Sequence, residues 1–306
     1  DQAVTALLYV IEKTRGRKKG EKHGEQYHEV AYQVASQSMI LLKNESGILP
    51  LNPQKKIAVI GEMAKQPRFQ GSGSSHVNVF RLVDAYSQIE KICPQLCYAP
   101  GYSDETTTPE MIAEAARIAQ NCDQVVLFAG LPSSYEAESY DRQDMKMPQA
   151  HNDLIAAVAQ ANPEVVVVLS NGSPVEIPWL GQAKGLLEAY LGGEASGAAI
   201  ADILFGRVNP SGKLAETFPV KLEDNPSYLN FPGEGDRVEY REGIFVGYRY
   251  YEKKKMRPAF AFGHGLSYTT YAYSDLKLEK SFLTDQEQLK VSFKVKNTGQ
   301  KAGKEI

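Results

Sequence analysis

The sequence has few cysteines and no large excess of charge of either sign. Its 306 residues include three cysteines, Cys93, Cys97 and Cys122, and the formal net charge is −3. Three cysteines are too few for a disulfide framework, and this set lacks histidine partners at zinc-finger spacing. A small net charge gives no general attraction to nucleic acid or to an anionic membrane. We therefore expect reduced thiols, no bound metal, and no nucleic-acid or membrane partner.

Long apolar runs are also missing. The longest, at residues 165–169, is far below the roughly 20 residues that a membrane-spanning helix needs. The glycine- and serine-rich stretch at 71–75 follows a strand pattern but lacks the lysine of a phosphate-binding loop, so we expect no nucleotide and no other cofactor. With few cysteines and no visible export signal, the expected location is the cytoplasm.

Apolar periodicity alternates between strand and helix over the first two thirds of the chain. Runs that are apolar on both faces predict buried strands, and they are separated by segments of helical period. Such alternation is typical of a parallel sheet covered by helices on both sides, an α/β sandwich of the (α/β)6 kind. The predicted strands are 56–61, 124–131, 164–170 and 185–190; the predicted helices are 25–42, 79–92, 109–120, 150–160 and 195–205.

The two ends of the chain do not follow this alternating pattern. Residues 3–13 form an uncapped helical stripe followed by a basic run at 13–22, and a long irregular stretch begins after residue 208. Segments 273–278 and 289–297 then alternate with period two, as in the opening strands of a β-sandwich. We expect this organisation: connector 1–24, α/β sandwich domain 25–219, irregular wrapping segment 220–270, and partial β-sandwich 271–306.

The strongest candidate for chemistry is the sequence Glu-Ala-Glu-Ser-Tyr-Asp-Arg at residues 136–142, directly after a predicted buried strand. The carboxyl ends of parallel strands are where open α/β sheets bind ligands. Glu136 and Glu138 are two residues apart, so in extended backbone they project on one side, and their repulsion favours the protonated form of one. A protonated carboxyl can act as a general acid in glycoside hydrolysis, which also needs a second, ionised carboxylate. A solvated acidic loop is the alternative.

Several longer motifs together resemble the family 3 glycoside hydrolases, specifically bacterial β-glucosidases, over essentially the whole chain. The motifs occur in the order typical of that family. They are Ser-Met-Ile-Leu-Leu-Lys-Asn at 38–44 with Ile-Leu-Pro-Leu at 48–51, Asn-Pro-Ser-Gly-Lys-Leu at 209–214, Glu-Gly-Ile-Phe-Val-Gly-Tyr-Arg-Tyr-Tyr at 242–251, and Phe-Gly-His-Gly-Leu-Ser-Tyr-Thr at 262–269.

The resemblance implies a three-part enzyme with an N-terminal (β/α)8 barrel, this sandwich and a fibronectin type III-like domain. In that family the barrel supplies a nucleophilic aspartate followed by tryptophan, and this chain contains no Asp-Trp pair, because its only tryptophan follows Pro178. The family's acid/base motif, Glu-Gly-Tyr/Phe-Asp-Arg, maps onto residues 138–142, with Ser139 in place of glycine. The resemblance thus implies Glu138 as acid/base, with Glu136 as the fallback. It also places Arg142, Gln70, Ser74 and Ser75 at the sugar site.

The expected function is one part of a retaining β-glucosidase that hydrolyses terminal non-reducing β-D-glucosyl residues. The missing barrel domain and a β-glucoside or oligosaccharide are the expected partners, and the chain alone should be inactive. The unfinished β-sandwich also favours a homo-oligomer. Two alternatives are a non-catalytic carbohydrate-binding or interaction module and a related β-xylosidase or exo-glucanase.

Overall fold

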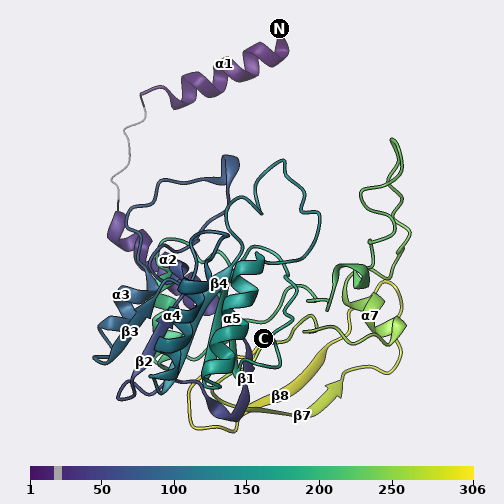
Figure 1. Cartoon of the computed structure of the whole chain (residues 1–306). Helices are drawn as coiled ribbons and strands as arrows, with labels where there is room; N and C mark the ends of the chain where they lie inside the picture. Colours follow the sequence, from purple (N-terminus) through teal and green to yellow (C-terminus); the bar gives the residue numbers. More distant parts are fainter. Residues whose placement is uncertain (17–22) are drawn as a thin grey trace.

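A computed structural model of the chain describes residues 1–16 and 23–306, so most of the predicted basic run at 13–22 lies outside the described residues. The main sheet has six strands in the order β1-β6-β5-β4-β2-β3 (Figure 1). Strand β1 is antiparallel to β6, and all other neighbours are parallel. The strands are β1 (Ile40–Asn44), β2 (Ile57–Ile60), β3 (Leu96–Ala99), β4 (Gln124–Gly130), β5 (Val165–Ser170) and β6 (Gly185–Glu188).

Helices cover both faces of this sheet. Helices α4 (Pro109–Gln120) and α5 (Gln149–Ala161) contact each other on one face, and α2 (Gly24–Ser38), α3 (Ala85–Glu90) and α6 (Ser196–Leu204) pack together on the other (Figure 1). This division follows from the right-handed crossover rule for parallel strands. The chain moves in one direction across the sheet from β2 to β3, and in the opposite direction from β3 to β4 and from β4 to β5, so α3 lies on one face and α4 and α5 lie on the other. The expected α/β sandwich is confirmed.

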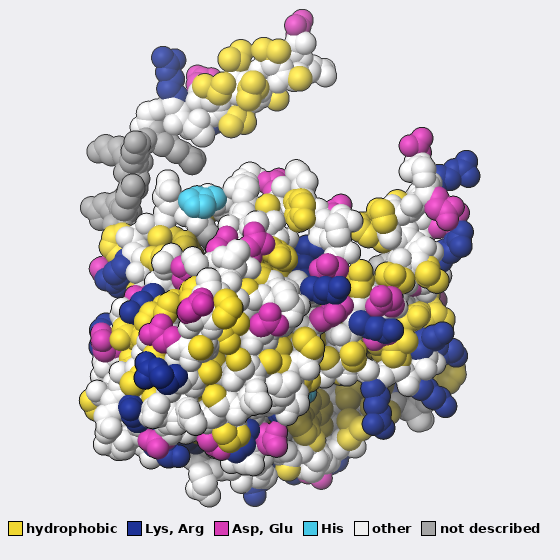
Figure 2. Space-filling model, in the orientation of Figure 1, with side chains coloured by type: hydrophobic (Ala, Val, Ile, Leu, Met, Phe, Trp, Pro, Cys, Tyr) yellow, Lys and Arg dark blue, Asp and Glu magenta, His cyan; other side chains and the backbone are white. Residues whose placement is uncertain are grey.

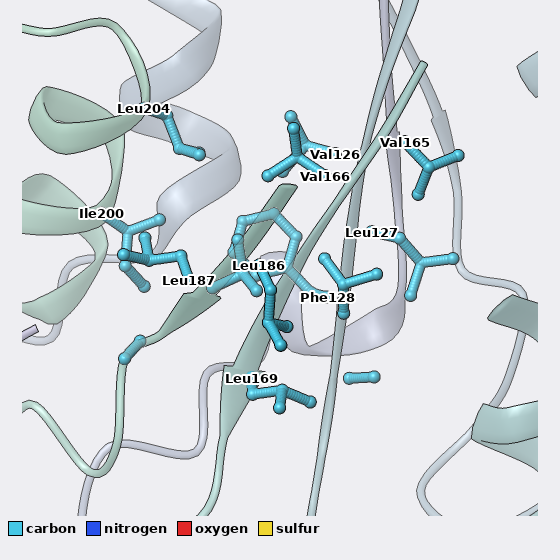
Figure 3. Close-up of a cluster of buried hydrophobic side chains, with 14 of the residues drawn as sticks. Val126, Leu127, Phe128, Val165, Val166, Leu169, Leu186, Leu187, Ile200 and Leu204 are labelled. Carbon is cyan, nitrogen blue, oxygen red and sulfur yellow. The ribbon is translucent and has the colours of Figure 1, made fainter. Parts of the chain in front are cut away.

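The core lies where the central strands meet the helices. Every residue of β4 and β5 is buried, as their unbroken apolar runs predict. In Figure 3, Ile200 and Leu204 of α6 extend toward Leu187 of β6 and the valines of the neighbouring strands. Full burial of one such side chain stabilises the fold by about 1.5–3 kcal/mol. The apolar pattern therefore fixes the sheet, and the sheet positions the loops at its edges.

Three local predictions were wrong. The helix expected at 25–42 is shorter: α2 stops at Ser38, and the buried run at residues 40–44 pairs with β6 as strand β1. Strand β3 was not predicted, because most of its residues are only partly buried and its short sequence shows no clear alternation of apolar and polar residues. The helix expected at 79–92 is limited to α3, since the preceding residues form an extended strap whose Phe80 and Arg81 amides donate to the Glu194 carboxylate at 2.7 and 3.3 Å.

The terminal segments form separate small elements. Strands β7 (Tyr271–Leu278) and β8 (Val291–Asn297) make an antiparallel two-stranded sheet, as the alternating pattern predicts. A short helix, α7 (Tyr248–Lys254), interrupts the segment expected to be irregular. Helix α1 (Gln2–Thr14) has no buried residue and stands away from the sandwich (Figure 1). Among the described residues, no helix has both the length and the apolar character to cross a bilayer.

Candidate active site

The candidate site lies where the strand order of the sheet reverses. From β2 the chain moves outward to β3 and then returns to β4 on the other side of β2, so the loops after β2 and β4 diverge at their carboxyl ends. Such a switch point leaves a crevice that open α/β sheets use for ligands. Gly61, the residue after β2, has φ +108°, and a β-carbon there would lie 2.2 Å from the Phe128 carbonyl oxygen. Only glycine permits this close approach of the two strands.

A pocket of about 610 Å³ occupies the crevice. The loop after β2 contributes Arg68 and most of residues 71–75, and the loop after β4 contributes most of residues 136–142. Gly172 and Ser173, from the loop after β5, and Leu191, after β6, complete the wall. The two larger loops touch directly, because Ser72 and Ala137 form a parallel β-bridge. Segments more than sixty positions apart in sequence therefore share one cavity.

Glu138 presents its carboxylate to this pocket. The side chain is exposed, and in the described part of the chain its one hydrogen-bond donor is the Ser74 amide, 3.1 Å from Oε2. The bond fixes one oxygen against the loop after β2 and leaves the other open to solvent. A carboxyl group held in this way can exchange a proton with a bound ligand.

Glu136 is in a different situation, although it is only two residues away. Its side chain is 14% exposed, and Oε2 accepts from Arg68 Nη1 at 3.0 Å and from the Gly172 amide at 2.8 Å. The hydroxyl of Ser173 donates to Oε1 at 2.6 Å. Three donors occupy the oxygens of this carboxylate, so the geometry favours Glu138 over Glu136 as a proton donor.

The other predicted site residues divide between two pockets. Arg142, Ser74 and Ser75 line the same pocket as the two glutamates. Arg142 Nη1 donates to the Ser173 hydroxyl at 2.8 Å and to the Pro174 carbonyl at 3.1 Å, and burial lowers the pKa of its guanidinium. Gln70 lines a neighbouring pocket and uses its amide to bond both backbone groups of Val77, which closes its own loop.

The sequence did not identify Arg68 or the Gly172-Ser173 turn as parts of the site. Arg68 is a charged residue between Pro67 and Phe69, just before the glycine- and serine-rich loop, and its side chain is 7% exposed. An arginine that directly precedes a ligand loop was the available signal. Its contacts with the loop after β4 depend on strand order, which the local sequence does not encode.

The backbone at Ser139 explains the glycine of the related motif. Ser139 has φ +64°, in the left-handed region where a side chain is strained and glycine is not. The turn at this residue lets the chain reverse just after Glu138, with Tyr140 bonding back to the Ala137 carbonyl at 3.2 Å. The acid/base candidate therefore sits at the second position of a tight turn that begins at Ala137.

A second, fully buried carboxyl group lies behind the pocket wall. Glu188, at the end of β6, is 0% exposed, and burial raises its pKa to about 8. Its oxygens accept from the Tyr190 amide at 3.0 Å and from Asn171 Nδ2 at 3.2 Å. At neutral pH Glu188 is therefore largely protonated and adds little negative charge near Glu136. Residues 1–16 and 23–306 contain no group of three or more His, Cys, Asp or Glu side chains that could hold a metal ion.

The fold and this site define the C-terminal sandwich domain of a glycoside hydrolase family. Residues 39–268 match the glycosyl hydrolase family 3 C-terminal domain, and the chain belongs to that family. Thermostable beta-glucosidase B of Acetivibrio thermocellus is 56% identical over 277 residues, which cover 89% of this chain and 37% of the relative. Exo-alpha-(1->6)-L-arabinopyranosidase of Bifidobacterium longum is 43% identical over 260 residues, covering 81% and 34%. The chain thus spans a little over a third of the length of these relatives.

Solved structures agree with this assignment. The GH3 beta-glucosidase of Bifidobacterium adolescentis superposes with a TM-score of 0.88 at 41% identity, covering 95% of this chain and 44% of that chain. The beta-glucosidase of Kluyveromyces marxianus in complex with glucose gives a TM-score of 0.85 at 27% identity, covering 98% and 55%. The likeness covers the two-stranded sheet as well, which matches the start of a fibronectin type III-like domain.

Proposed function

We propose that this chain supplies the acid/base carboxyl of a retaining β-glucosidase that releases terminal non-reducing β-D-glucosyl residues. Glu138 is that group. The observation that carries the proposal is the contrast between the two neighbouring glutamates: Glu136 is held by three donors, whereas Glu138 has a single backbone donor and faces the pocket.

In the first step, protonated Glu138 gives its proton to the glycosidic oxygen while a carboxylate on the opposite side of the sugar attacks the anomeric carbon. The resulting glycosyl-enzyme intermediate is hydrolysed in the second step, where Glu138 as carboxylate removes a proton from water. A retaining enzyme needs the two carboxyl groups about 5–5.5 Å apart. The nucleophile must therefore be brought against this pocket by another part of the protein.

We assign the nucleophile to an aspartate in an N-terminal barrel domain, which is also the main partner of this chain. Two apolar surfaces support such a partner. Helix α1 exposes apolar side chains along its length, which Figure 2 shows in yellow. An arm at residues 228–246 also exposes apolar side chains, next to the charged side chains that Figure 2 shows at its tip. Large exposed apolar surfaces mark interaction sites. We assign the connector role to residues 1–24 and the wrapping role to residues 220–270.

The direct test is the complete protein with Glu138→Gln. The variant should hydrolyse an alkyl β-glucoside or cellobiose about 100- to 10,000-fold more slowly than the wild type, because these leaving groups need a proton. With a dinitrophenyl β-glucoside, whose leaving group departs without a proton, the rate of the first step should fall far less. Azide should accelerate turnover by the variant, because this nucleophile can replace water without the help of a base. Intact hydrolysis of the alkyl glucoside would contradict the proposal.

The 306-residue chain alone should not hydrolyse aryl β-glucosides, because it lacks the nucleophile. Turnover close to that of a complete family member would contradict the assignment of the nucleophile to a barrel domain. A non-catalytic carbohydrate-binding module is the competing function, and calorimetric titration of the chain with glucose and cellobiose distinguishes it. Tight binding by the lone chain would favour the module.

The choice of sugar is a separate part of the proposal. One relative is named as a β-glucosidase and another as an exo-α-(1→6)-L-arabinopyranosidase, so the same sandwich accompanies different glycones. We favour glucose because the more similar of these two relatives is the β-glucosidase. A panel of nitrophenyl β-glucoside, β-xyloside and α-L-arabinopyranoside would decide, and a preference for xylose or arabinose would revise the substrate but not the role of Glu138.

Location and assembly complete the proposal. The three cysteines are free thiols, which supports a reducing compartment such as the cytoplasm. The open edges of the β7–β8 pair support self-association through unpaired strands. Cell fractionation checks the first point and light scattering after size-exclusion chromatography checks the second.

A further inference from the structure

We infer that Arg68 and Glu136 form a positioning pair, which sets the position of the Glu138 carboxyl for proton transfer. The inference rests on the proposed function and adds two residues that do not themselves touch the reacting atoms. It gives Glu136 a role in positioning Glu138, and not the role of an alternative acid/base residue.

Arg68 binds the segment that leads to Glu138 at four points. Its Nη1 donates to the carbonyl oxygens of Leu131 and Pro132 at 2.6 and 3.0 Å, and to Glu136 Oε2 at 3.0 Å. Its Nη2 donates to the Glu136 carbonyl oxygen at 3.2 Å. The guanidinium thus engages both ends of residues 131–136, which begin at the carboxyl end of β4. A planar fork of donors can hold several acceptors at once, and the single ammonium of lysine cannot reproduce that geometry.

Glu136 extends the same network to a third loop. Its carboxylate accepts from the Gly172 amide at 2.8 Å and from the Ser173 hydroxyl at 2.6 Å, both in the loop after β5. Arg142 Nη1 donates to that same hydroxyl at 2.8 Å. The loops after β2, β4 and β5 are therefore joined through one buried ion pair whose side chains are 7% and 14% exposed.

Glu138 lies two residues beyond this anchor. Between the anchor and Glu138, Ala137 forms a bridge with Ser72, and the Ser74 amide donates to the Glu138 carboxylate; Ser72 and Ser74 both belong to the loop after β2. If the ion pair is removed, the backbone before Glu138 keeps the single bridge at Ala137 but is held less firmly at residues 131–136, and the carboxyl can move relative to a sugar in the pocket. A displacement of about 1 Å at a reacting group costs about 100-fold in rate.

The test compares Arg68→Lys and Glu136→Gln in the complete protein, using two glucosides with the same sugar and different leaving groups. Both variants should lower kcat by about 10- to 100-fold for an alkyl glucoside, with little change in KM, and by only a few-fold for a dinitrophenyl glucoside. A merely structural role would reduce the active fraction and lower both rates by the same factor. Equal loss on both substrates would therefore overturn the inference.

Glu164→Gln is the matched control. Glu164 forms an ion pair with Lys184 at the amino ends of β5 and β6, on the opposite edge of the sheet from the pocket. Its loss should change neither rate. If Arg68→Lys does not fold, Ser173→Ala is the alternative, because it removes one donor to Glu136 and keeps the ion pair. Its rate should also fall more on the alkyl glucoside than on the dinitrophenyl glucoside, but by a smaller factor. Equal rates with the wild type on both substrates would count against the inference.

Glu138→Gln, measured in parallel, separates this inference from the proposed function. If Glu138→Gln shows no dependence on leaving group, the proposed function itself fails. If it shows the dependence but Arg68→Lys and Glu136→Gln behave like the wild type, only the positioning role fails. Amide hydrogen exchange in the 306-residue chain gives an independent readout: both variants should accelerate exchange in residues 133–141, whereas Glu164→Gln should not, and unchanged exchange there would overturn the inference.

Discussion

Gly73 lies directly against Glu138: a β-carbon on Gly73 would come within 3.0 Å of the Glu138 β-carbon and 3.3 Å of its backbone nitrogen. The glycine also has φ +80°, a conformation that favours glycine. The loop after β2 can therefore approach the acid/base candidate closely enough for the Ser74 amide to reach its carboxylate. The shape of one loop sets the position of the acid/base candidate on another.

The first prediction follows from this contact. Gly73→Ala should push Glu138 by a few tenths of an ångström and lower kcat of the complete protein on alkyl glucosides by about 3- to 10-fold. Gly263→Ala is a matched control, because Gly263 has the same φ of +80° but no atom within 4 Å of its added β-carbon. Steady-state kinetics checks both variants. Similar loss of activity in the two would mean that backbone strain, and not contact with Glu138, is responsible.

The second prediction concerns the strained turn that follows Glu138. Ser139→Gly should raise the free energy of unfolding by about 0.5–1 kcal/mol, because the gain from relieving the left-handed conformation exceeds the entropy that glycine loses on folding. Urea denaturation of the chain measures the change. Ser134, in the same loop, does not have a positive φ, so Ser134→Gly should leave stability unchanged or lower it. A destabilised Ser139→Gly variant would contradict this interpretation of the turn.

The third prediction concerns the dependence of stability on pH at Glu188. Burial raises the pKa of Glu188 from 4.5 to about 8, so between these values the folded chain holds a proton that the unfolded chain has released. Its contribution to stability is thus complete below about pH 4.5, falls as the pH rises, and is lost above about pH 8. The fall should be on the order of a few kcal/mol.

Glu188→Gln stays neutral at every pH and should remove this slope. Urea denaturation of the wild type and the variant between pH 5 and pH 9 gives the difference, which isolates Glu188 from other titrating groups. Glu164→Gln, the same substitution at the partly exposed amino end of β5, is measured alongside as the control. Parallel profiles for the wild type and Glu188→Gln would show that the buried carboxyl has no raised pKa.

The fourth prediction concerns the strap before α3. Burial raises the pKa of Glu194, but hydrogen bonds from His28 and from the Phe80 and Arg81 amides outweigh burial and lower it overall. Glu194→Ala should release the strap, with a loss of about 1–3 kcal/mol in stability and faster hydrogen exchange at the two amides. Glu194→Gln keeps an acceptor for Phe80 and should have the smaller effect. Equal exchange in wild type and Glu194→Ala would contradict the role of Glu194 as an anchor.

Some features of the candidate site could be predicted because they are local. Glu138 follows a strand whose apolar run is unbroken, and the resemblance to the family motif selects it from two nearby glutamates. Arg68 could not be connected to Glu136 in the same way. The two residues are 68 positions apart and meet only because β2 and β4 are neighbours in the sheet. The positive φ of Ser139 likewise became visible only when the turn was seen.

The sequence by itself determined the α/β sandwich, the alternation of its central strands and helices, and the family to which the chain belongs. Those features depend on apolar period and on contiguous motifs, which record burial residue by residue. Only the tertiary structure decided that residues 40–44 form an edge strand and that Glu136 is buried against Arg68 while Glu138 is open. The reason is physical: pairing of distant segments depends on strand order and on the space left between loops, and neither is a property of a local stretch of chain.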